Sequence, residues 1–134
     1  MKKIIYENDK FEFSIIDNAI FRILLKPLTR ILAADLVKNK AAFDPFFTKP
    51  KMPFIIIFDE NMSVDEKVHE VFSSPERSYF KNYEAFVLKS LTHKLIAKNI
   101  DKIYPTQHER KFFNTEKDAL LWIQEKLKSE ELKV

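Results

Sequence analysis

The sequence lacks two residue types on which many enzyme classes depend, cysteine and glycine. Without cysteine there are no disulfides, no thiolate nucleophiles and no cysteine-bound zinc sites. Average glycine usage of about 7% would give a chain of this length roughly nine glycines. Phosphate-binding loops, dinucleotide-binding turns and nucleophile elbows need glycine for close backbone approach or for positive φ. The absence of glycine therefore excludes these three kinds of site.

The sequence also lacks a long hydrophobic run. Its longest apolar stretch, Phe54 to Phe58, is far shorter than the roughly 20 residues that a membrane-spanning helix needs. The acidic residues Glu7 and Asp9 follow the basic start too early for a secretory signal peptide. We therefore expect no transmembrane segment and a cytoplasmic location.

Neither sign of charge dominates, because the chain has 23 basic and 20 acidic residues and a net charge of +3. One basic stripe is present: Lys94, Lys98 and Lys102 recur every fourth residue along one predicted helix. Such a stripe is either a solvated helix face or a surface for an anionic partner such as lipid headgroups. It lacks the arginines and aromatics that stacking on nucleic acid would require, so nucleic acid is disfavoured as a partner.

What the sequence does contain is an alternation of strand and helix patterns within one domain, residues 1–134, with an ordered core from about 4 to 128. Period-two and continuous apolar runs predict strands, and apolar residues three and four apart predict helices. The predicted strands are 11–17, 19–26, 53–59, 84–89 and 109–113. The predicted helices are 29–43, 63–74, 75–80, one that starts at Ser90 or Leu91 and ends at Pro105, and one that is capped by Asn114 or Thr115 and runs to about 128. In the helix that ends at Pro105, apolar residues are predicted to face inward, namely Leu95, Ile96, Ile100 and Ile103. Residues 129–134 are expected to fray.

These elements define the fold class. The order is β-β-α-β-α-β-α-β-α, with a non-helical connection around Pro45, Pro50 and Pro53. The run 53–59 is apolar up to its final Asp, so it is predicted to be the central strand, buried on both faces. We predict an α/β domain with a mixed sheet of about five strands, parallel in its later part and covered by four main helices.

Several strings within this order resemble the small SpoIIAA-like proteins of the STAS superfamily, and more narrowly the STAS/SEC14-like small bacterial proteins. They are Met52-Pro-Phe-Ile-Ile-Ile-Phe-Asp59, Ser63-Val-Asp65, Glu84-Ala-Phe-Val-Leu-Lys89 leading into Leu91 to Ile100, and Phe112-Phe-Asn-Thr-Glu-Lys-Asp-Ala-Leu-Leu-Trp-Ile123. The resemblance implies a SpoIIAA-like fold and a regulatory role through partner proteins. It also implies that some relatives are switched by a phosphorylated Ser or Thr, for which Ser63 is the nearest position, although the family's Gly-ending phosphosite motif is absent. SEC14-like relatives bind lipids between sheet and helices.

The candidate recognition site lies just beyond the central strand, at Asp59, Glu60 and Ser63. In open α/β sheets, ligands bind beyond the carboxyl ends of the strands, which is where these residues are expected. Ser63 to Glu66 also matches a capping box, so the alternative is an ordinary helix N-terminus with acidic residues that complement its dipole.

Aromatic residues form a second candidate surface, since the chain contains 13 Phe. Phe46 and Phe47 lie in the proline-containing connection, and Tyr79 and Phe80 follow Pro75. If these side chains are exposed, they form a partner surface, most simply for a symmetric homodimer; if they fold under, they belong to the core.

We predict no catalytic residues, no metal site and no cofactor, because the three His are scattered and no nucleophile has an activating arrangement. The predicted function is a non-enzymatic protein-interaction or regulatory module of STAS-like type. The alternative is a small carrier that binds a lipid or other apolar ligand between sheet and helices.

Overall fold

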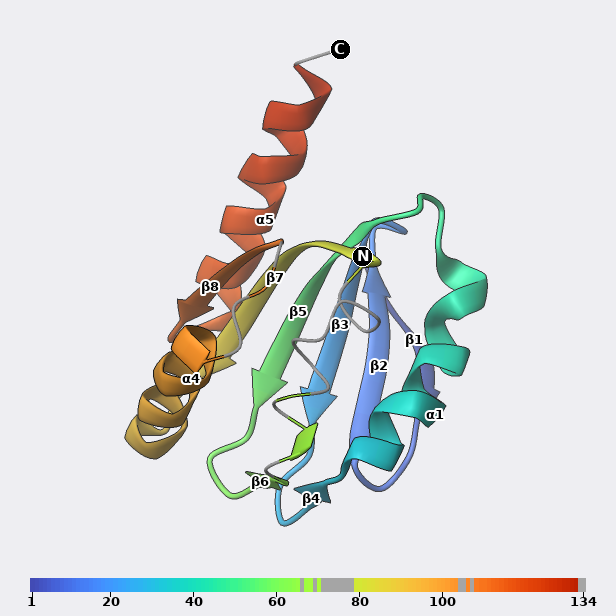
Figure 1. Cartoon of the computed structure of the whole chain (residues 1–134). Helices are drawn as coiled ribbons and strands as arrows, with labels where there is room; N and C mark the ends of the chain where they lie inside the picture. Colours follow the sequence, from blue (N-terminus) through green and yellow to red (C-terminus); the bar gives the residue numbers. More distant parts are fainter. Residues whose placement is uncertain (66, 69, 71–78, 104–105, 107, 133–134) are drawn as a thin grey trace.

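Six strands form one mixed sheet in the order β1-β2-β3-β5-β7-β8, and a separate pair, β4 and β6, lies beside it (Figure 1). The computed structural model describes residues 1–65, 67–68, 70, 79–103, 106 and 108–132. The elements are β1 (Lys2–Glu7), β2 (Phe11–Ile16), β3 (Ile20–Leu25), β4 (Arg30–Ile31), α1 (Ala33–Phe43), the 3-10 helix η1 (Asp44–Phe46), β5 (Met52–Phe58), β6 (Ser63–Val64), β7 (Lys81–Leu88), α4 (Leu91–Ile103), β8 (Glu109–Phe113) and α5 (Glu116–Glu131).

The first three strands form an antiparallel meander that turns tightly without glycine. β2 pairs with β3 through a two-residue turn, at which Asp17 and Asn18 have φ values of 53° and 55°. This left-handed conformation at both positions is that of a type I′ hairpin turn. Asp and Asn tolerate it better than other non-glycine residues, which is why this pair can replace the usual Asn-Gly.

β5 is an inner strand of the sheet, as the sequence predicted. It pairs in parallel with β3 on one side and with β7 on the other, and β7 pairs in parallel with β8. The side chains of Phe54, Ile55 and Ile56 are almost completely buried although successive side chains point to opposite faces. Both faces of β5 are therefore covered, which explains why its sequence is continuously apolar.

The two faces of the sheet carry two separate apolar clusters. On one face, α5 places Ala119 and Ile123 against Ile55 and Val87. On the other face, the larger cluster packs against α1 and against Ala97 of α4, and Figure 1 shows α1 and α4 on the opposite side of the sheet from α5. The α/β class with helices on both faces of a mixed sheet is therefore confirmed.

The sheet has six strands where about five were predicted, because β1 was missed. The side chains of β1 are exposed or partly exposed, so the segment has no apolar alternation that would identify a strand. Its pairing comes from backbone hydrogen bonds to the edge of β2, which are independent of side-chain type. The C-terminal helix also continues to Glu131, past the predicted fraying point at 129.

The helix predicted to start at Ser63 does not start there. Ser63 instead begins the short strand β6, which pairs in parallel with β4. The backbone N–H of Ser63 donates to Thr29 at 3.0 Å, and that of Asp65 donates to Ile31 at 2.8 Å. The capping-box prediction was wrong because carbonyls distant in sequence satisfy these N–H groups. Residues 67, 68 and 70 are helical, and the remainder of the predicted 63–74 and 75–80 helices falls outside the described residues.

Two neighbouring predictions need smaller corrections. The helix predicted from residue 29 begins at Ala33, because Arg30–Ile31 pairs as β4 and the Asp35 carboxylate accepts the N–H of Leu32 at 2.8 Å. The connection around Pro45 was predicted to be non-helical, but Asp44–Phe46 forms one turn of 3-10 helix, with Pro45 in its first turn. Proline is compatible with a first turn because its missing N–H would have no intrahelical partner there.

Helix α4 has the predicted length, but three of the four apolar residues predicted to face inward are exposed. Leu95, Ile96 and Ile103 were predicted to point inward, and all three are exposed; the side chain of Ile100 lies outside what the structure describes. The periodicity of a helix shows that an apolar stripe exists, but it does not show against which surface the helix is placed.

Candidate functional site

A cavity of about 440 Å3 lies between the sheet and the elements that cover its α1 side. Its floor is formed by side chains of the inner strands, and its walls come from α1, from residues 60, 62–64 and 68, and from α4. The described residues that line it include Phe11, Ile23, Phe54, Ile56, Phe58, Phe86 and Leu88 from the sheet, Ile31, Leu36 and Phe43 from the α1 side, Met62, Val64 and Val68 from the middle segment, and Ile96 and Ala97 from α4. The volume is within the range of small-molecule sites, and the lining is predominantly apolar.

Polar groups meet this cavity at two places. Glu60, Ser63, Ser90, Thr92 and His93 lie at the carboxyl ends of β5 and β7. Two cations, Lys81 and Arg110, line the part of the wall formed by the first half of β7 and by β8; Asn39 of α1 also lines the cavity. The cavity is thus an apolar chamber with polar groups at separate positions on its wall.

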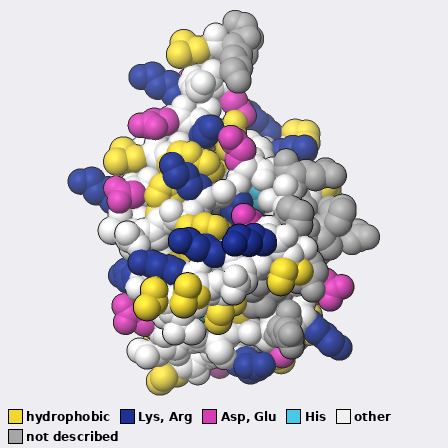
Figure 2. Space-filling model, turned by 60° about the vertical axis from the view of Figure 1, so that its left-hand side comes forward, with side chains coloured by type: hydrophobic (Ala, Val, Ile, Leu, Met, Phe, Trp, Pro, Cys, Tyr) yellow, Lys and Arg dark blue, Asp and Glu magenta, His cyan; other side chains and the backbone are white. Residues whose placement is uncertain are grey.

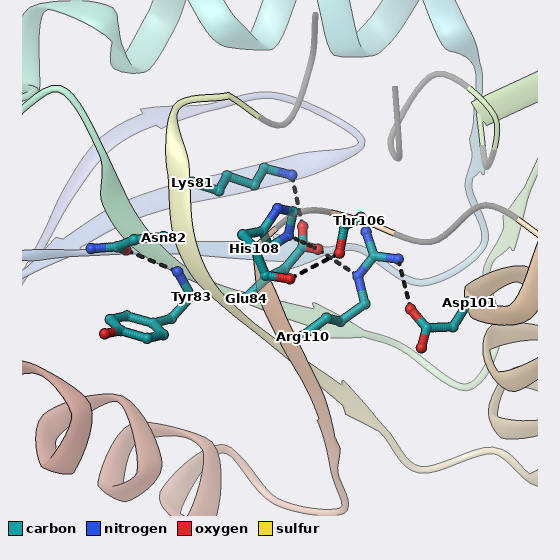
Figure 3. Close-up of polar contacts among 8 residues, drawn as sticks. All are labelled: Lys81, Asn82, Tyr83, Glu84, Asp101, Thr106, His108 and Arg110. Atoms are coloured by element: carbon teal, nitrogen blue, oxygen red, sulfur yellow. Dashed lines mark hydrogen bonds and ion pairs between the residues drawn. The ribbon is translucent and has the colours of Figure 1, made fainter. Parts of the chain in front are cut away.

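The two cations belong to a buried ion cluster centred on Glu84 (Figure 3). Lys81 donates to the Glu84 carboxylate at 2.7 Å, and Nε of Arg110 donates to it at 2.6 Å. His108 Nε2 lies 3.0 Å from the same carboxylate, so this nitrogen carries the proton because a carboxylate only accepts. The Arg110 guanidinium also reaches Asp101 of α4 at 3.4 Å, which links the cluster to that helix.

The local fold explains how these groups meet. Glu84 of β7 is in direct register with Arg110 of β8, so the carboxylate and the guanidinium face each other across the strands. Lys81 lies at the start of the same strand and also sits over the ring of Phe54, 5.4 Å from its centre. The Arg110 guanidinium stacks 4.8 Å from the ring centre of Phe86. The cations are therefore held against aromatic rings as well as against the carboxylate.

Burial and charge act in opposite directions on Glu84. Burial alone would raise the pKa of this carboxyl group, but Lys81, Arg110 and His108 lower it, and the net result is a pKa well below the ordinary value. Glu84 therefore stays ionised across the physiological pH range. A group held in this way is suited to fixing the two cations in place and is poorly suited to proton transfer near neutral pH.

The residues predicted from the end of the central strand have different positions. Glu60 and Ser63 line the cavity. Asp59 is engaged in the turn that follows β5, where its carboxylate accepts the N–H of Asn61 at 2.9 Å. Ser63 is exposed, and its hydroxyl lies 3.4 Å from the guanidinium of Arg30. The structure thus brings two of the three residues to the cavity wall.

The aromatic residues mostly belong to the core. Phe80 is buried, and Phe46 and Phe47 are partly buried and packed against the main cluster. Phe47 contacts the rings of Phe21 and Phe43 at centroid distances of 4.9 and 6.0 Å. Of the four aromatic candidates, Tyr79 alone is largely exposed, at 59%. Of the two alternatives that the sequence left open for these aromatic residues, exposed partner surface or core, the three phenylalanines belong to the core.

The basic stripe lies on α4, the helix on which its four-residue spacing was predicted to place it. Lys98 and Lys102 are exposed, and Lys94 is partly buried. Lys94 and Lys98 also border a second, more polar hollow near the start of α5, together with Asn114 and Asp118. The stripe is therefore on the surface, beside the exposed apolar residues of the same helix.

Sequence reasoning missed the Glu84 cluster. The one local signal was Glu84 itself, a charged residue directly before the apolar run Ala85 to Leu88. Its partners on β8 become visible only when the register of the two strands is known. Among the residues with described positions, no group of three or more His, Asp or Glu could hold a metal ion. No helix in the described part of the chain is both long enough and apolar enough to cross a membrane.

No protein-family model matches this chain, and no curated protein matches it. Among solved structures, the chain is similar to the crystal structure of an uncharacterized protein of the DUF3478 family with a SpoIIAA-like fold, from Shewanella loihica PV-4. The two share 13% sequence identity, with a TM-score of 0.50 over 92% of each chain. The SpoIIAA-like fold predicted from the sequence is therefore confirmed, and an identity this low shows the fold alone.

Proposed function

We propose that this protein is a small non-enzymatic carrier or sensor that holds an apolar molecule between its sheet and its helices. The observation that carries this proposal is the apolar cavity of about 440 Å3. Exposed residues such as Glu60, Ser63 and Thr92 are part of its lining, so the cavity opens to solvent and a ligand can reach its apolar interior. It has the lining expected of a small-molecule site, with apolar walls and a few polar groups at fixed positions.

The chemistry of the walls favours binding over catalysis. The two cations that line the cavity, Lys81 and Arg110, are held by the buried Glu84 carboxylate, and the one lining carboxylate, Glu60, is exposed. The remaining lining is mostly hydrocarbon and aromatic. The expected ligand is therefore predominantly apolar and small enough to fit this volume.

Titration with the uncharged fluorescent probe N-phenyl-1-naphthylamine tests this proposal, alongside native mass spectrometry of the freshly purified protein. We expect saturable binding of about one probe per chain. Ala97→Phe, which places a ring in the cavity from α4, is expected to weaken probe binding at least about tenfold, since it removes volume that the probe occupies. The matched control is Ala34→Phe, at an exposed position of α1.

Two outcomes would contradict the carrier function. One is unchanged probe affinity in Ala97→Phe, which would place the probe elsewhere. The other is probe binding that Leu95→Ser abolishes, because Leu95 is an exposed residue on the outer side of α4 and does not line the cavity.

The second candidate function is a protein-interaction or regulatory module, and the segment after β5 favours it. Glu60 and Ser63 are exposed there, and the Ser63 hydroxyl lies beside the guanidinium of Arg30. A phosphate on this hydroxyl would meet that cation, although Asp65 already pairs with Arg30 at 3.0 Å. Intact-mass analysis of the protein from its native cells tests for such a phosphate. Affinity capture that retains the same protein with Asp59→Ala plus Ser63→Ala as with the native chain would argue against this surface.

A further inference from the structure

Helix α4 exposes an apolar face that a surface helix would ordinarily bury. The exposed fractions are 72% for Leu91, 57% for Leu95, 42% for Ile96 and 65% for Ile103. Leu91 and Leu95 are four residues apart, and Ile96 and Ile103 are seven apart, so each pair lies in one row along the helix. The exposed side chains of Thr92 and Asn99 lie between the two rows, and together these residues form what we call the outer face of α4.

The helix is held to the body of the protein by its opposite side. His93 Nε2 bonds to the carbonyl of Met62 at 3.0 Å, Ala97 packs against the core, and Asp101 meets the Arg110 guanidinium at 3.4 Å. His93, Ala97 and Asp101 follow one another at intervals of four residues and so form a single inner row. Polar bonds and a small side chain anchor α4, while the four large apolar side chains named above are exposed.

Basic residues accompany the exposed apolar ones. Lys98 and Lys102 are exposed and continue the row that begins with Leu91 and Leu95. The one acidic residue of α4 is Asp101, which lies on the inner row. Figure 2 turns this side of the molecule forward and shows dark blue basic side chains directly beside yellow hydrophobic ones over its lower half. The outer face thus combines positive charge with exposed hydrocarbon and carries no acidic residue.

We propose that the outer face of α4 docks on a membrane surface that contains anionic lipids. A helix of this type lies in the plane of the interface, with its apolar side chains among the lipid chains and its lysines at the headgroups. A symmetric contact with a second copy would bring the same lysines together, which like-charge repulsion opposes. Nucleic acid would use the lysines but not the leucines, and α4 presents no aromatic ring for base stacking.

The position of α4 relative to the cavity is consistent with this assignment. Ile96 is exposed on the outer face and also lines the cavity, and Thr92 lines it one turn earlier. A docked α4 would therefore hold one wall of the cavity at the membrane. The docking proposal does not depend on whether the cavity carries a ligand, because it rests on the outer face alone.

Co-sedimentation of the full chain with two kinds of vesicle tests the proposal. One kind is made of phosphatidylcholine, and the other contains phosphatidylglycerol as well. We expect binding to the anionic vesicles that weakens as salt is added, and much weaker binding to the neutral ones. Lys98→Gln plus Lys102→Gln is expected to weaken binding about 25-fold, since each lysine near an anionic surface contributes about fivefold. The matched control, Lys117→Gln plus Lys128→Gln, removes two exposed lysines of α5 and is expected to leave binding unchanged.

A leucine exchange tests the apolar part of the face. Leu95→Ser is expected to weaken vesicle binding about tenfold. The reason is that a leucine side chain placed among the lipid chains leaves water and contributes most of its transfer free energy to binding. The control is Leu121→Ser on α5, where Leu121 is exposed to 48%. Absent binding, equal binding to both vesicles, or insensitivity to Leu95→Ser would overturn the proposal. So would a concentration-dependent dimer, detected by analytical ultracentrifugation, that Leu95→Ser abolishes.

Discussion

Replacing Glu84 by Gln tests whether the buried cluster is held together by charge. The exchange preserves the shape of the side chain and removes its negative charge. In the native protein this carboxylate accepts from Lys81 at 2.7 Å and from Arg110 at 2.6 Å, and it is completely buried. The amide of Gln would present one oxygen and one NH2 to groups that only donate.

The expected loss of stability follows from this geometry. Removing one partner of a buried charge pair costs about 3–5 kcal/mol of unfolding free energy, because the remaining charges keep their desolvation cost. For a chain of 134 residues, each kcal/mol corresponds to roughly 3–5 °C in Tm. We therefore expect the Tm of the Glu84→Gln variant to fall by about 9–25 °C.

Urea and thermal unfolding followed by circular dichroism measure this change. The control is Glu109→Gln on the neighbouring strand, where Glu109 is 57% exposed and pairs with Lys126 at 3.2 Å. An exposed pair of this kind contributes less than about 1 kcal/mol. If Glu84→Gln costs no more than the control, the cluster is not held by the Glu84 charge and our reading of the cavity wall is wrong.

The same variant carries a pH prediction. The pKa of Glu84 is lowered in the folded state relative to its ordinary value of about 4.3. Its stabilising contribution is therefore fully present above pH 4.3 and is lost as the pH falls below that value toward the folded-state pKa. We expect the stability difference between the native protein and Glu84→Gln to be constant from pH 5 to 7 and to shrink below about pH 4. A difference that grows as the solution is acidified would refute this assignment.

Three further experiments, with five exchanges in all, test the fold and the cavity by thermal unfolding. Ala97→Phe, which places a ring in the cavity, should change the unfolding free energy by less than about 1 kcal/mol. Ala85→Phe, on the closely packed α5 face of the sheet, should lower it by about 3 kcal/mol. Equal effects of the two exchanges would argue against an open cavity. Thr115→Ala should cost about 1 kcal/mol because its hydroxyl caps α5 at Asp118, while Ser63→Ala should cost almost nothing if Ser63 caps no helix. Leu28→Asn should stabilise by about 0.5 kcal/mol, since Leu28 adopts a φ of 58° that Asn tolerates better; a loss of stability would contradict this.

Prediction from the sequence worked where local pattern and burial coincide. β5 is apolar at every position because both of its faces are covered, so its sequence alone identified it as a central strand. Asn114 or Thr115 was predicted as the cap of the last helix, and the Thr115 hydroxyl accepts the N–H of Asp118 at 3.2 Å. In both cases local sequence is sufficient. The partner of Thr115 lies only three residues away, and the burial of β5 is visible in its own apolar residues.

Prediction failed where the partner is distant in sequence. Ser63 has the pattern of a cap, but the carbonyl of Thr29 takes its N–H into a strand pair. The outward orientation of Leu95 is decided by the bonds that His93 and Asp101 make to other elements. The residues that flank Ser63 and Leu95 in the sequence do not indicate any of these contacts.

The amino-acid sequence by itself determined the class of fold and the chemistry that is excluded, because apolar periodicity and the absence of cysteine and glycine are properties of the chain alone. The tertiary structure decided the cavity, the Glu84 cluster and the exposed face of α4. Each of these depends on strand register and on the placement of helices over the sheet. Strand register and helix placement are set by contacts between residues far apart in the chain, and the local sequence does not show which residues will meet.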